Sequence, residues 1–416
     1  MADSLVPEHV TDFPLRDPLV LLPAGGTLQA LQATPDLPPF GALQIDFAAA
    51  LSRTLTTSPA ARQHPELMAL GFWLRPAHLK KLIDEQLSAS ADVLQMPRGL
   101  CLHIAPGNVD TIFVYSWMLS LLCGNRSVVR ISSRESAQTQ ALLATLAELL
   151  QQPAWAAITR HVLFVRYGHD DDITRRLSAA CDMRIIWGGD NAVTTLRACP
   201  LPPHATELCF PDKFSMSLLR AAPLRALAPP AVDALAKALS NDAYTFGQMA
   251  CSSPRLVLWL GNDADTQAAR ALLWPAVEAR VPQLHHGLGA AEAINKAVSA
   301  DLLAMDTDVH IEAGHPLVRR IWLDQPAVHA DLHCGGGLFH EARIDKLDGL
   351  LPLLSRRVQT VSSWGFSRAE LLQWARAAGP RGIDRFVPVG QALDFAPVWD
   401  GMNLWRAFLR EIDIRC

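Results

Sequence analysis

The sequence has no hydrophobic run long enough to cross a bilayer and no cluster of lysine and arginine. Its most apolar helix-like stretch, Ile112 to Cys123, is well short of the roughly 20 residues that a membrane-spanning helix needs. We therefore interpret this stretch as a buried helix and expect no membrane span. The net charge is -4 and no basic face is present, so nucleic acid and anionic membrane surfaces are not expected as ligands.

The sequence also lacks a CxxC pair and a recognisable signal peptide. Scattered cysteines without an export signal are typical of reduced thiols in the cytosol. We therefore expect a cytoplasmic protein whose thiols are reduced. The eight cysteines are Cys101, Cys123, Cys181, Cys199, Cys209, Cys251, Cys334 and Cys416.

The chain has 416 residues and is 50% hydrophobic, which suffices for a sizeable core and usually means two or three domains. Between residues 98 and 198, strand-like and helix-like runs alternate. Such alternation predicts an α/β fold with a parallel, doubly wound sheet, in which ligands bind beyond the carboxyl ends of the strands. The strand-like runs are Gly99 to Ala105, Ser127 to Ile131, His161 to Tyr167 and Met183 to Trp187.

Three loops follow these strands and are the expected ligand-binding loops: Pro106 to Asn108, Ser132 to Arg134, and Gly188 to Asp190. Prolines at 200, 202 and 203 then interrupt the alternation and indicate a domain edge. A second α/β unit follows. Its predicted strands are Phe214 to Leu219, Arg255 to Leu260, Val318 to Leu323, Gly337 to Ile344, Val358 to Ser362 and Arg385 to Val389.

One cysteine lies in the most informative segment of the chain. Asn241 to Pro254 reads NDAYTFGQMACSSP, and Cys251 lies where a helix-like run gives way to a strand-like one. A thiol at such a junction can be partly exposed and electrostatically activated, which suits it to attack a carbonyl and carry an acyl group. The alternative is that Cys251 is one more buried small residue, because free cysteine is among the most buried types.

Three segments together resemble the aldehyde dehydrogenase superfamily, and more closely its acyl-CoA reductase branch, the LuxC family, which makes the aldehyde used in bacterial bioluminescence. The segments are HIAPGNVDTIFVYSWMLSLLCGN (His103 to Asn125), NDAYTFGQMACSSP (Asn241 to Pro254) and RFVPVGQALDFAPVWDG (Arg385 to Gly401). The resemblance implies an aldehyde dehydrogenase-like fold, with a doubly wound dinucleotide domain and an α/β catalytic domain, and the reduction of an acyl-CoA to an aldehyde with NADPH.

Residues 1–89 are rich in Leu, Ala and Pro without clear periodicity, and we interpret them only as an N-terminal arm and helices. The resemblance implies the rest of the domain plan, in which residues 90–205 form the dinucleotide-binding domain and 206–384 the catalytic domain with the thiol. The C-terminal segment, 385–416, packs back or lies at a subunit interface, and we expect a homo-oligomer.

Three residues are matched to catalytic roles by the resemblance. Cys251 is the nucleophile that forms a thioester, and Asn108 donates its side-chain amide to the developing oxyanion; Asn108 would equally suit a helix N-cap. Glu207 matches the start of the superfamily's ELGG motif, although Cys209 and Phe210 replace the glycines. Its role is deprotonation of the thiol or proton handling during thioester exchange, and the alternative is a solvated surface glutamate.

The coenzyme prediction depends on two strand ends. Arg130, Ser132, Ser133 and Arg134 match the loop under the adenosine ribose, where hydroxyl and guanidinium groups suit a 2′-phosphate and favour NADPH. An ordinary surface arginine and a serine N-cap would explain the same residues. Gly188 and Gly189 close a strand where backbone N–H groups could approach the pyrophosphate, and a plain turn explains them as well.

Some alternatives stay open. The expected substrate is an acyl-CoA, with acyl-transferring proteins as possible partners. Acyl-carrier-protein or acyl-phosphate donors, aldehyde oxidation, and a subunit that accepts an acyl group without reducing it are the other interpretations. No metal is expected, although His329, His333, Cys334, His340 and Glu341 are close in sequence, because Gly335 to Gly337 and a predicted strand interrupt them.

Overall fold

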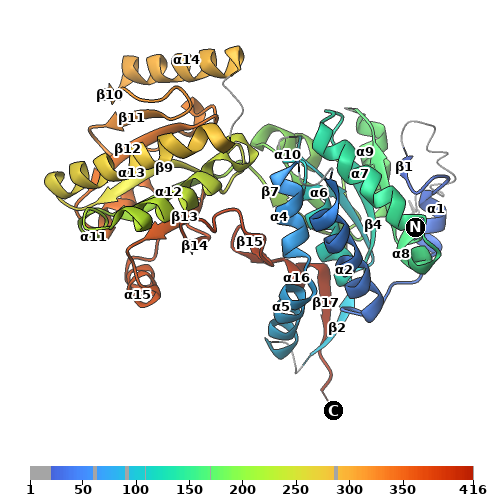
Figure 1. Ribbon diagram of the computed structural model, residues 1–416. Coiled ribbons are helices and arrows are strands. Elements are labelled where there is room, and N and C mark those ends of the chain that lie inside the picture. Colours follow the sequence, from blue (N-terminus) through green and yellow to red (C-terminus); the bar gives the residue numbers. More distant parts are fainter. Residues whose placement is uncertain are drawn as a thin grey trace, which may run out of the picture. The chain divides into compact units, whose positions relative to one another are not determined.

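The computed structural model describes residues 20–59, 63–89, 93–107, 109–168, 170–284 and 289–415. The chain divides into two compact units, and each is described by itself (Figure 1). The first unit comprises Met1–Pro211 together with Phe395–Cys416, and the second comprises Asp212–Asp394. In the described ranges, no helix is long and apolar enough to cross a membrane.

The first unit is built on a six-stranded sheet in the order β1-β5-β4-β3-β6-β7. All neighbouring strands are parallel except β1, which runs antiparallel to β5. The order confirms the predicted doubly wound topology, because the chain moves outward from β3 to β5 and then returns to the other side of β3. The strands are β1 (Val20–Leu22), β3 (Leu100–Ile104), β4 (Arg126–Ile131), β5 (Val162–Arg166), β6 (Met183–Trp187) and β7 (Thr206–Phe210).

Helices connect and cover this sheet. They are α1 (Leu28–Ala33), α2 (Ala42–Thr57), α4 (Pro65–Trp73), α5 (Pro76–Ala89), α6 (Ile112–Leu122), α7 (Ala137–Leu150), α8 (Ala156–Thr159), α9 (Asp171–Ala180) and α10 (Asp190–Arg197), with a 3-10 turn at Pro153–Trp155. Every residue of α6 is buried, as predicted for the most apolar stretch. The helix ends before Gly124, whose φ is 87° and where a Cβ would meet the Leu37 carbonyl oxygen at 2.1 Å, so only glycine fits.

The end of the chain returns to the first unit. It forms β15 (Val398–Trp399), β16 (Met402–Asn403), α16 (Leu404–Phe408) and β17 (Leu409–Ile412), and β17 pairs antiparallel with β2 (Leu94–Pro97). The Phe395 ring stacks on Tyr115 of α6 with 4.8 Å between ring centroids. This segment is therefore an integral part of the packing of the first unit.

The second unit is built on a seven-stranded sheet in the order β10-β11-β12-β9-β8-β13-β14, parallel except for the pair β10 and β11. The strands are β8 (Phe214–Arg220), β9 (Pro254–Leu260), β10 (Val309–Ile311), β11 (Arg319–Leu323), β12 (Leu338–Ile344), β13 (Val358–Trp364) and β14 (Arg385–Pro388). The helices are α11 (Ala221–Leu224), α12 (Pro229–Tyr244), α13 (Asp263–Leu284), α14 (Ala290–Asp306) and α15 (Arg368–Ala378), with 3-10 turns at Thr245–Gln248, Ala330–Leu332 and Leu347–Leu353.

Successive side chains along each strand point to opposite faces of this sheet, and each face packs against an apolar core. On β9, Val257 and Trp259 belong to the core that includes residues of α12 and α13, whereas Leu256 and Leu258 belong to the core on the other face. Burial on both faces is what a parallel sheet between helices requires, and it explains why β9 reads as a continuous apolar run.

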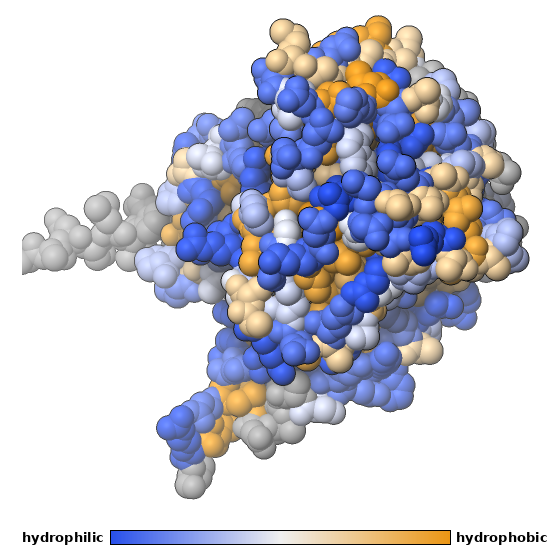
Figure 2. All heavy atoms as spheres, turned by 90° about the vertical axis from the view of Figure 1, so that its left-hand side faces the viewer, coloured by the Kyte–Doolittle hydropathy of each residue, from blue (hydrophilic) through white to orange (hydrophobic). Residues whose placement is uncertain are grey.

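One helix of the second unit keeps apolar side chains exposed. Ile294, Val298, Leu302 and Met305 follow one another along α14 at helical spacing and are 45% exposed or more. In the upper part of Figure 2, apolar surface, coloured orange, lies among polar side chains, coloured blue. Ala300 and Leu303 are buried in the core below, so α14 has two apolar sides.

The predicted elements were largely confirmed, but three edge strands of the two large sheets were missed. Val20–Leu22 and Thr206–Phe210, which contains Glu207, are the two edge strands of the first sheet, and Val309–Ile311 is an edge strand of the second. The strands of the two small sheets were not predicted either. The three edge strands are short, and edge strands need no continuous apolar run because one side is unpaired. The predicted domain boundaries stay a prediction.

Candidate active site

Cys251 lies in the second unit, in the turn between the 3-10 segment Thr245–Gln248 and β9, and is partly exposed. β8, β9, β12 and β13 are parallel, so their amino ends lie at the same edge of the sheet. Cys251 precedes β9 at this edge, the loop Gly335 to Gly337 precedes β12, and Gln359 lies near the start of β13.

The chain turns sharply just before the cysteine. Phe246, Gly247 and Gln248 have φ values of 59°, 58° and 63°. A left-handed backbone conformation costs roughly 1–2 kcal/mol for each residue other than glycine, so Phe246 and Gln248 need compensation from their surroundings.

The Gln248 side chain provides this compensation. It is fully buried, and its Nε2 donates to the carbonyl oxygens of Pro254 and Leu338, each at 2.9 Å. Its Oε1 accepts from the Gly337 backbone N–H at 2.9 Å. A backbone bond from the Gly336 N–H to the Gly247 carbonyl joins the same two loops. Gln248 therefore fixes the cysteine loop to the start of β9 and β12.

Two irregularities in strand pairing flank Cys251. Pro254 pairs with Ser215 and Leu256 with Met216, so β9 has an extra residue, Arg255. On the other side of β8, Val358 pairs with Phe214 and Val361 with Met216, so β13 also has one extra residue, between positions 358 and 361. Such bulges redirect side chains and occur often beside active sites.

The cysteine is bonded through both its backbone and its sulfur. Ser215 Oγ donates to the Cys251 carbonyl at 2.7 Å and accepts from the Thr360 backbone N–H at 3.1 Å. Gln359 Nε2 donates to Cys251 Sγ at 3.3 Å, and the Gln359 side chain is buried. A sulfur that accepts a hydrogen bond from an amide is stabilised in its thiolate form.

A cation lies in the same region. Burial lowers the pKa of Arg255, while Cys251 and Asp212 act in the opposite direction. Its Nε is buried and has no hydrogen-bond partner among the described residues. Arginine stays charged in proteins, and a positive charge near a thiol favours the thiolate that acts as nucleophile.

Three histidines pack beside these residues. His340 contacts His329 and His333 edge-to-face, with ring centroids 6.1 Å and 6.0 Å apart. Burial lowers the pKa of His340 to about 4 and the pKa of His333 well below its ordinary value. His333 Nε2 bonds the Leu338 carbonyl at 2.8 Å and its Nδ1 accepts from the Gly335 N–H, which is consistent with a neutral ring. Across the described part of the chain, no group of three His, Cys, Asp or Glu could hold a metal.

The predicted coenzyme loops lie in the first unit, at the carboxyl edge of its parallel strands. Between β3 and β6 the sheet order reverses, and this switch point is where such sheets bind dinucleotides. Gly107 follows β3, and a Cβ there would lie 2.9 Å from Ser132 Oγ in the loop after β4. Gly188 and Gly189 follow β6, and Gly189 is the N-cap of α10. The structure thus brings the predicted loops to one sheet edge.

The loop after β4 contains no carboxylate from Arg130 to Arg134. Arg130 donates to the carbonyls of Tyr167 and Gly168 at 3.3 and 3.4 Å and lies over the Tyr167 ring. Ser132 Oγ accepts from the Arg134 backbone N–H, and Ser133 and Arg134 are exposed. The next residue, Glu135, pairs with Arg166 at 3.0 Å. Exposed hydroxyl and guanidinium groups are suited to a phosphate.

Glu207 is held by two arginines in the first unit. Its Oε1 accepts from Arg184 Nε at 2.8 Å and its Oε2 from Arg197 Nε at 2.9 Å. Arg184 is buried and also donates to Ser178 and to the Cys199 carbonyl. Both carboxylate oxygens are thus engaged in ion pairs, so Glu207 is neither free nor a solvated surface residue. Asn108 lies outside the described residues.

Sequence reasoning missed Gln248, Gln359, Ser215 and Arg255. Gln248 could have been suspected, because it lies within the FGQMAC motif three residues before the cysteine. Arg255 could also have been suspected, because it follows Cys251 by four residues. Ser215 and Gln359 come from β8 and β13, which meet Cys251 only in the folded sheet.

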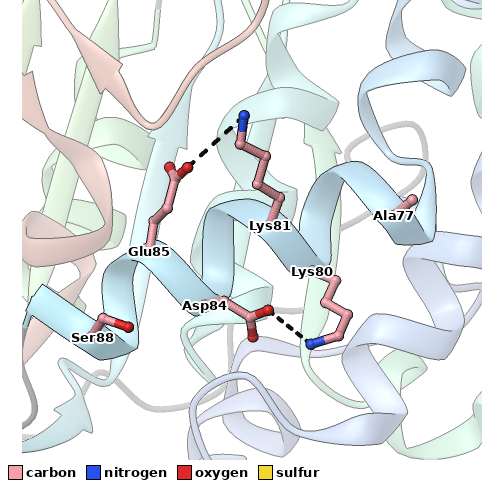
Figure 3. A pocket seen from close by; sticks show the side chains of 6 residues that line it. All are labelled: Ala77, Lys80, Lys81, Asp84, Glu85 and Ser88. Atoms are coloured by element: carbon pink, nitrogen blue, oxygen red, sulfur yellow. Dashed lines mark hydrogen bonds and ion pairs between the residues drawn. The ribbon is translucent and has the colours of Figure 1, made fainter.

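A surface pocket of the first unit lies elsewhere, on α5. Its six lining residues are Ala77, Lys80, Lys81, Asp84, Glu85 and Ser88 (Figure 3). Lys80 Nζ lies 2.8 Å from Asp84 Oδ2, and Lys81 Nζ lies 4.0 Å from Glu85 Oε1. Exposed pairs at this helical spacing contribute little energy, and the six lining residues include no cysteine or histidine. This pocket is a solvated helix face.

The fold is that of the aldehyde dehydrogenases, as comparison with solved structures shows. An oxidoreductase from Marinobacter aquaeolei aligns with a TM-score of 0.64 at 13% identity, covering 92% of this chain and 88% of that one. Lactaldehyde dehydrogenase from Escherichia coli aligns with a TM-score of 0.61 at 12% identity, covering 89% and 85%. These likenesses show that the chain has an aldehyde dehydrogenase-like fold.

The family follows from the sequence. A model of the family described as acyl-CoA reductase (LuxC) matches residues 53–306, more than half of the chain. This protein belongs to the LuxC family. It is 28% identical over 185 residues to the long-chain acyl-protein thioester reductase of Aliivibrio fischeri, covering 44% of this chain and 36% of that protein. It is 20% identical over 330 residues to the enzyme of that name from Photorhabdus laumondii, covering 75% and 62%. The chain therefore spans about a third to three fifths of the length of these curated relatives.

Proposed function

We propose that the protein reduces a fatty acyl thioester to an aldehyde through a thioester on Cys251, with NADPH as the reductant. The observation that carries the proposal is the environment of Cys251. The thiol is partly exposed, accepts a hydrogen bond from Gln359 and lies near the Arg255 charge, in a chain of the LuxC family. The first unit would hold the coenzyme and the second would carry the acyl group.

The chemistry assigned to Cys251 needs a thiolate. The thiolate attacks the acyl carbonyl, the carbon–sulfur bond to the donor breaks, and the donor leaves as a thiol after taking up a proton. The Cys251 backbone N–H and the Asn108 side-chain amide are the proposed donors to the oxyanion of the tetrahedral intermediate. The thioester suits reduction because sulfur donates little resonance to the carbonyl. A bound NADPH would supply the hydride to the thioester carbon. The thiohemiacetal alkoxide that this leaves on Cys251 would break its carbon–sulfur bond to give the aldehyde and return the thiolate.

The residues of the first unit fit a dinucleotide. Ser133 and Arg134 present an exposed hydroxyl and guanidinium at the end of β4, and the carboxylate of the next residue, Glu135, is paired with Arg166. The Gly188 backbone N–H donates to the Phe210 carbonyl at 3.2 Å, so of the two glycines before α10 only Gly189, the N-cap, is proposed to offer its backbone N–H to the pyrophosphate. Arg130 supports the loop through the Tyr167 and Gly168 carbonyls. These contacts support NADPH as the preferred coenzyme.

The donor is proposed to be an acyl-CoA. The matching relatives from Aliivibrio fischeri and Photorhabdus laumondii are named acyl-protein thioester reductases, so an acylated partner protein is the second candidate. The two donors share the thioester that Cys251 attacks and differ only in the group that leaves. Purified protein incubated with NADPH and fatty acyl-CoA, acyl-protein thioester or acyl phosphate in turn separates them by the rate of NADPH oxidation.

The proposed function is tested with two cysteine variants. Cys251→Ala should abolish both acyl labelling and aldehyde formation. Cys334→Ala is the matched control, because Cys334 is also a partly exposed cysteine of the second unit. This variant should retain both activities. Aldehyde formation by folded Cys251→Ala at the wild-type rate would refute the proposal. Acyl labelling of wild type without NADPH oxidation on any donor would instead indicate a subunit that accepts acyl groups and does not reduce them.

A further inference from the structure

We infer that Gln359 is a positioning residue for the nucleophile: its amide N–H donates to Cys251 Sγ, stabilises the thiolate and fixes its direction. The inference rests on the proposed function, in which Cys251 is the attacking group. Gln359 Nε2 lies 3.3 Å from the sulfur, and the Gln359 side chain is 1% exposed. Water therefore competes little for this amide.

The orientation of the amide is set by a chain of hydrogen bonds. Arg385 Nε donates to Thr360 Oγ1 at 2.9 Å, and Thr360 Oγ1 donates to Gln359 Oε1 at 3.2 Å. A guanidinium can only donate, so the Thr360 hydroxyl must accept from Arg385 and has its own proton for Gln359. Gln359 Oε1 is thereby the acceptor end, which leaves the NH2 group facing the sulfur. Arg385, acting through Thr360, thus orients the Gln359 amide so that its NH2 group is the donor to Cys251 Sγ.

The backbone places Gln359 at this position. Gln359 and Thr360 lie within the irregular pairing of β13 with β8, between Val358 and Val361. The Thr360 backbone N–H, displaced from regular pairing, bonds Ser215 Oγ, and the same hydroxyl donates to the Cys251 carbonyl. The bulge therefore connects to the cysteine twice, at its carbonyl through Ser215 and at its sulfur through Gln359. Without the extra residue in β13, the side chain of Gln359 or of Thr360 would point to the other face of the sheet.

The chemical consequence is a more reactive thiol. An amide N–H favours the charged form of the sulfur without adding a charge of its own. Arg255 acts in the same direction from β9. The bond also limits rotation of the Cys251 side chain, which keeps the sulfur aligned for attack.

The test is the pH dependence of Cys251 alkylation by iodoacetamide, followed by mass spectrometry of the Cys251 peptide. Gln359→Met keeps the volume and removes the donor, so the alkylation midpoint should rise by about one pH unit, which is about tenfold slower alkylation below the midpoint. Thr360→Val removes the group that orients the amide and should shift the midpoint in the same direction by less. Ser362→Ala is the matched control, because it removes a buried Ser217–Ser362 bond of 2.7 Å on the same strands without touching Cys251.

The outcomes separate the inference from the proposed function. An upward shift in Gln359→Met and Thr360→Val, with an unchanged midpoint in Ser362→Ala, supports the inference. Equal midpoints in wild type and Gln359→Met overturn it, even if wild-type Cys251 is acylated by substrate. If Gln359→Met does not fold, Thr360→Val decides alone, and a wild-type midpoint there overturns the inference. Absence of acyl labelling in the wild-type protein refutes the proposed function. The alkylation midpoints still decide whether Gln359 stabilises the Cys251 thiolate, because that measurement uses no acyl substrate.

Discussion

Replacement of Gln248 is the sharpest test of how the cysteine loop is held. The side chain makes three hydrogen bonds, to the Pro254 and Leu338 carbonyls and from the Gly337 N–H, all inside the protein. Gln248→Ala removes all three and leaves the Gly337 N–H without this acceptor. At about 1 kcal/mol for each lost bond, with an additional penalty for a buried donor, the free energy of unfolding should fall by about 3–5 kcal/mol.

A second substitution at the same position separates the side chain from the backbone. Gln248 has a φ of 63°, which glycine adopts without strain. Gln248→Gly should therefore be about 1 kcal/mol more stable than Gln248→Ala, although both lose the same hydrogen bonds. Urea unfolding followed by circular dichroism measures both values. The reasoning would be refuted if Gln248→Ala unfolded at the wild-type urea concentration, or if the glycine variant were the less stable of the two.

Three further predictions concern pH, coenzyme and ion pairing. Burial lowers the pKa of His340 to about 4, so its contribution to stability is complete above pH 6.5 and falls as the pH drops toward 4. Between pH 6.5 and 5 this contribution to the free energy of unfolding should fall by about 2 kcal/mol. Urea unfolding at both pH values should therefore show a smaller fall in His340→Phe than in the wild-type protein. An equal fall in the two proteins would count against the lowered pKa of His340. Ser133→Glu should raise the KM for NADPH about tenfold and leave or lower that for NADH; an unchanged ratio of the two KM values would contradict the assignment. Glu207→Gln weakens the pairing of buried Arg184 and should lower the unfolding free energy by about 3 kcal/mol; thermal melts that match wild type would show that the pair is not stabilising.

Much of the architecture could be predicted from the sequence because buried parallel strands and amphipathic helices differ in period. The run at 183–187 was predicted with the bounds that β6 has. The cysteine was located from its motif at a helix-to-strand junction. These features depend on residues that are close together in the chain, and the spacing of apolar residues in the sequence indicates them directly.

The surroundings of the cysteine could not be predicted because they depend on non-local pairing. Gln359 is 108 positions from Cys251 in the chain, and it reaches the sulfur only because β13 bulges where it pairs with β8. Glu207 illustrates the same limit. Its two arginine partners, Arg184 on β6 and Arg197 at the end of α10, become neighbours only when β7 joins the edge of the first sheet.

The central claim is that Cys251 carries the acyl group, and trapping that adduct tests it most directly. The protein is incubated without coenzyme with whichever donor supports NADPH oxidation, digested, and mapped by mass spectrometry. The account predicts one acyl group on the Cys251 peptide, which disappears as aldehyde forms when NADPH is added. An acyl group on another residue, or aldehyde formed while Cys251 stays unmodified and blocked by alkylation, would contradict it.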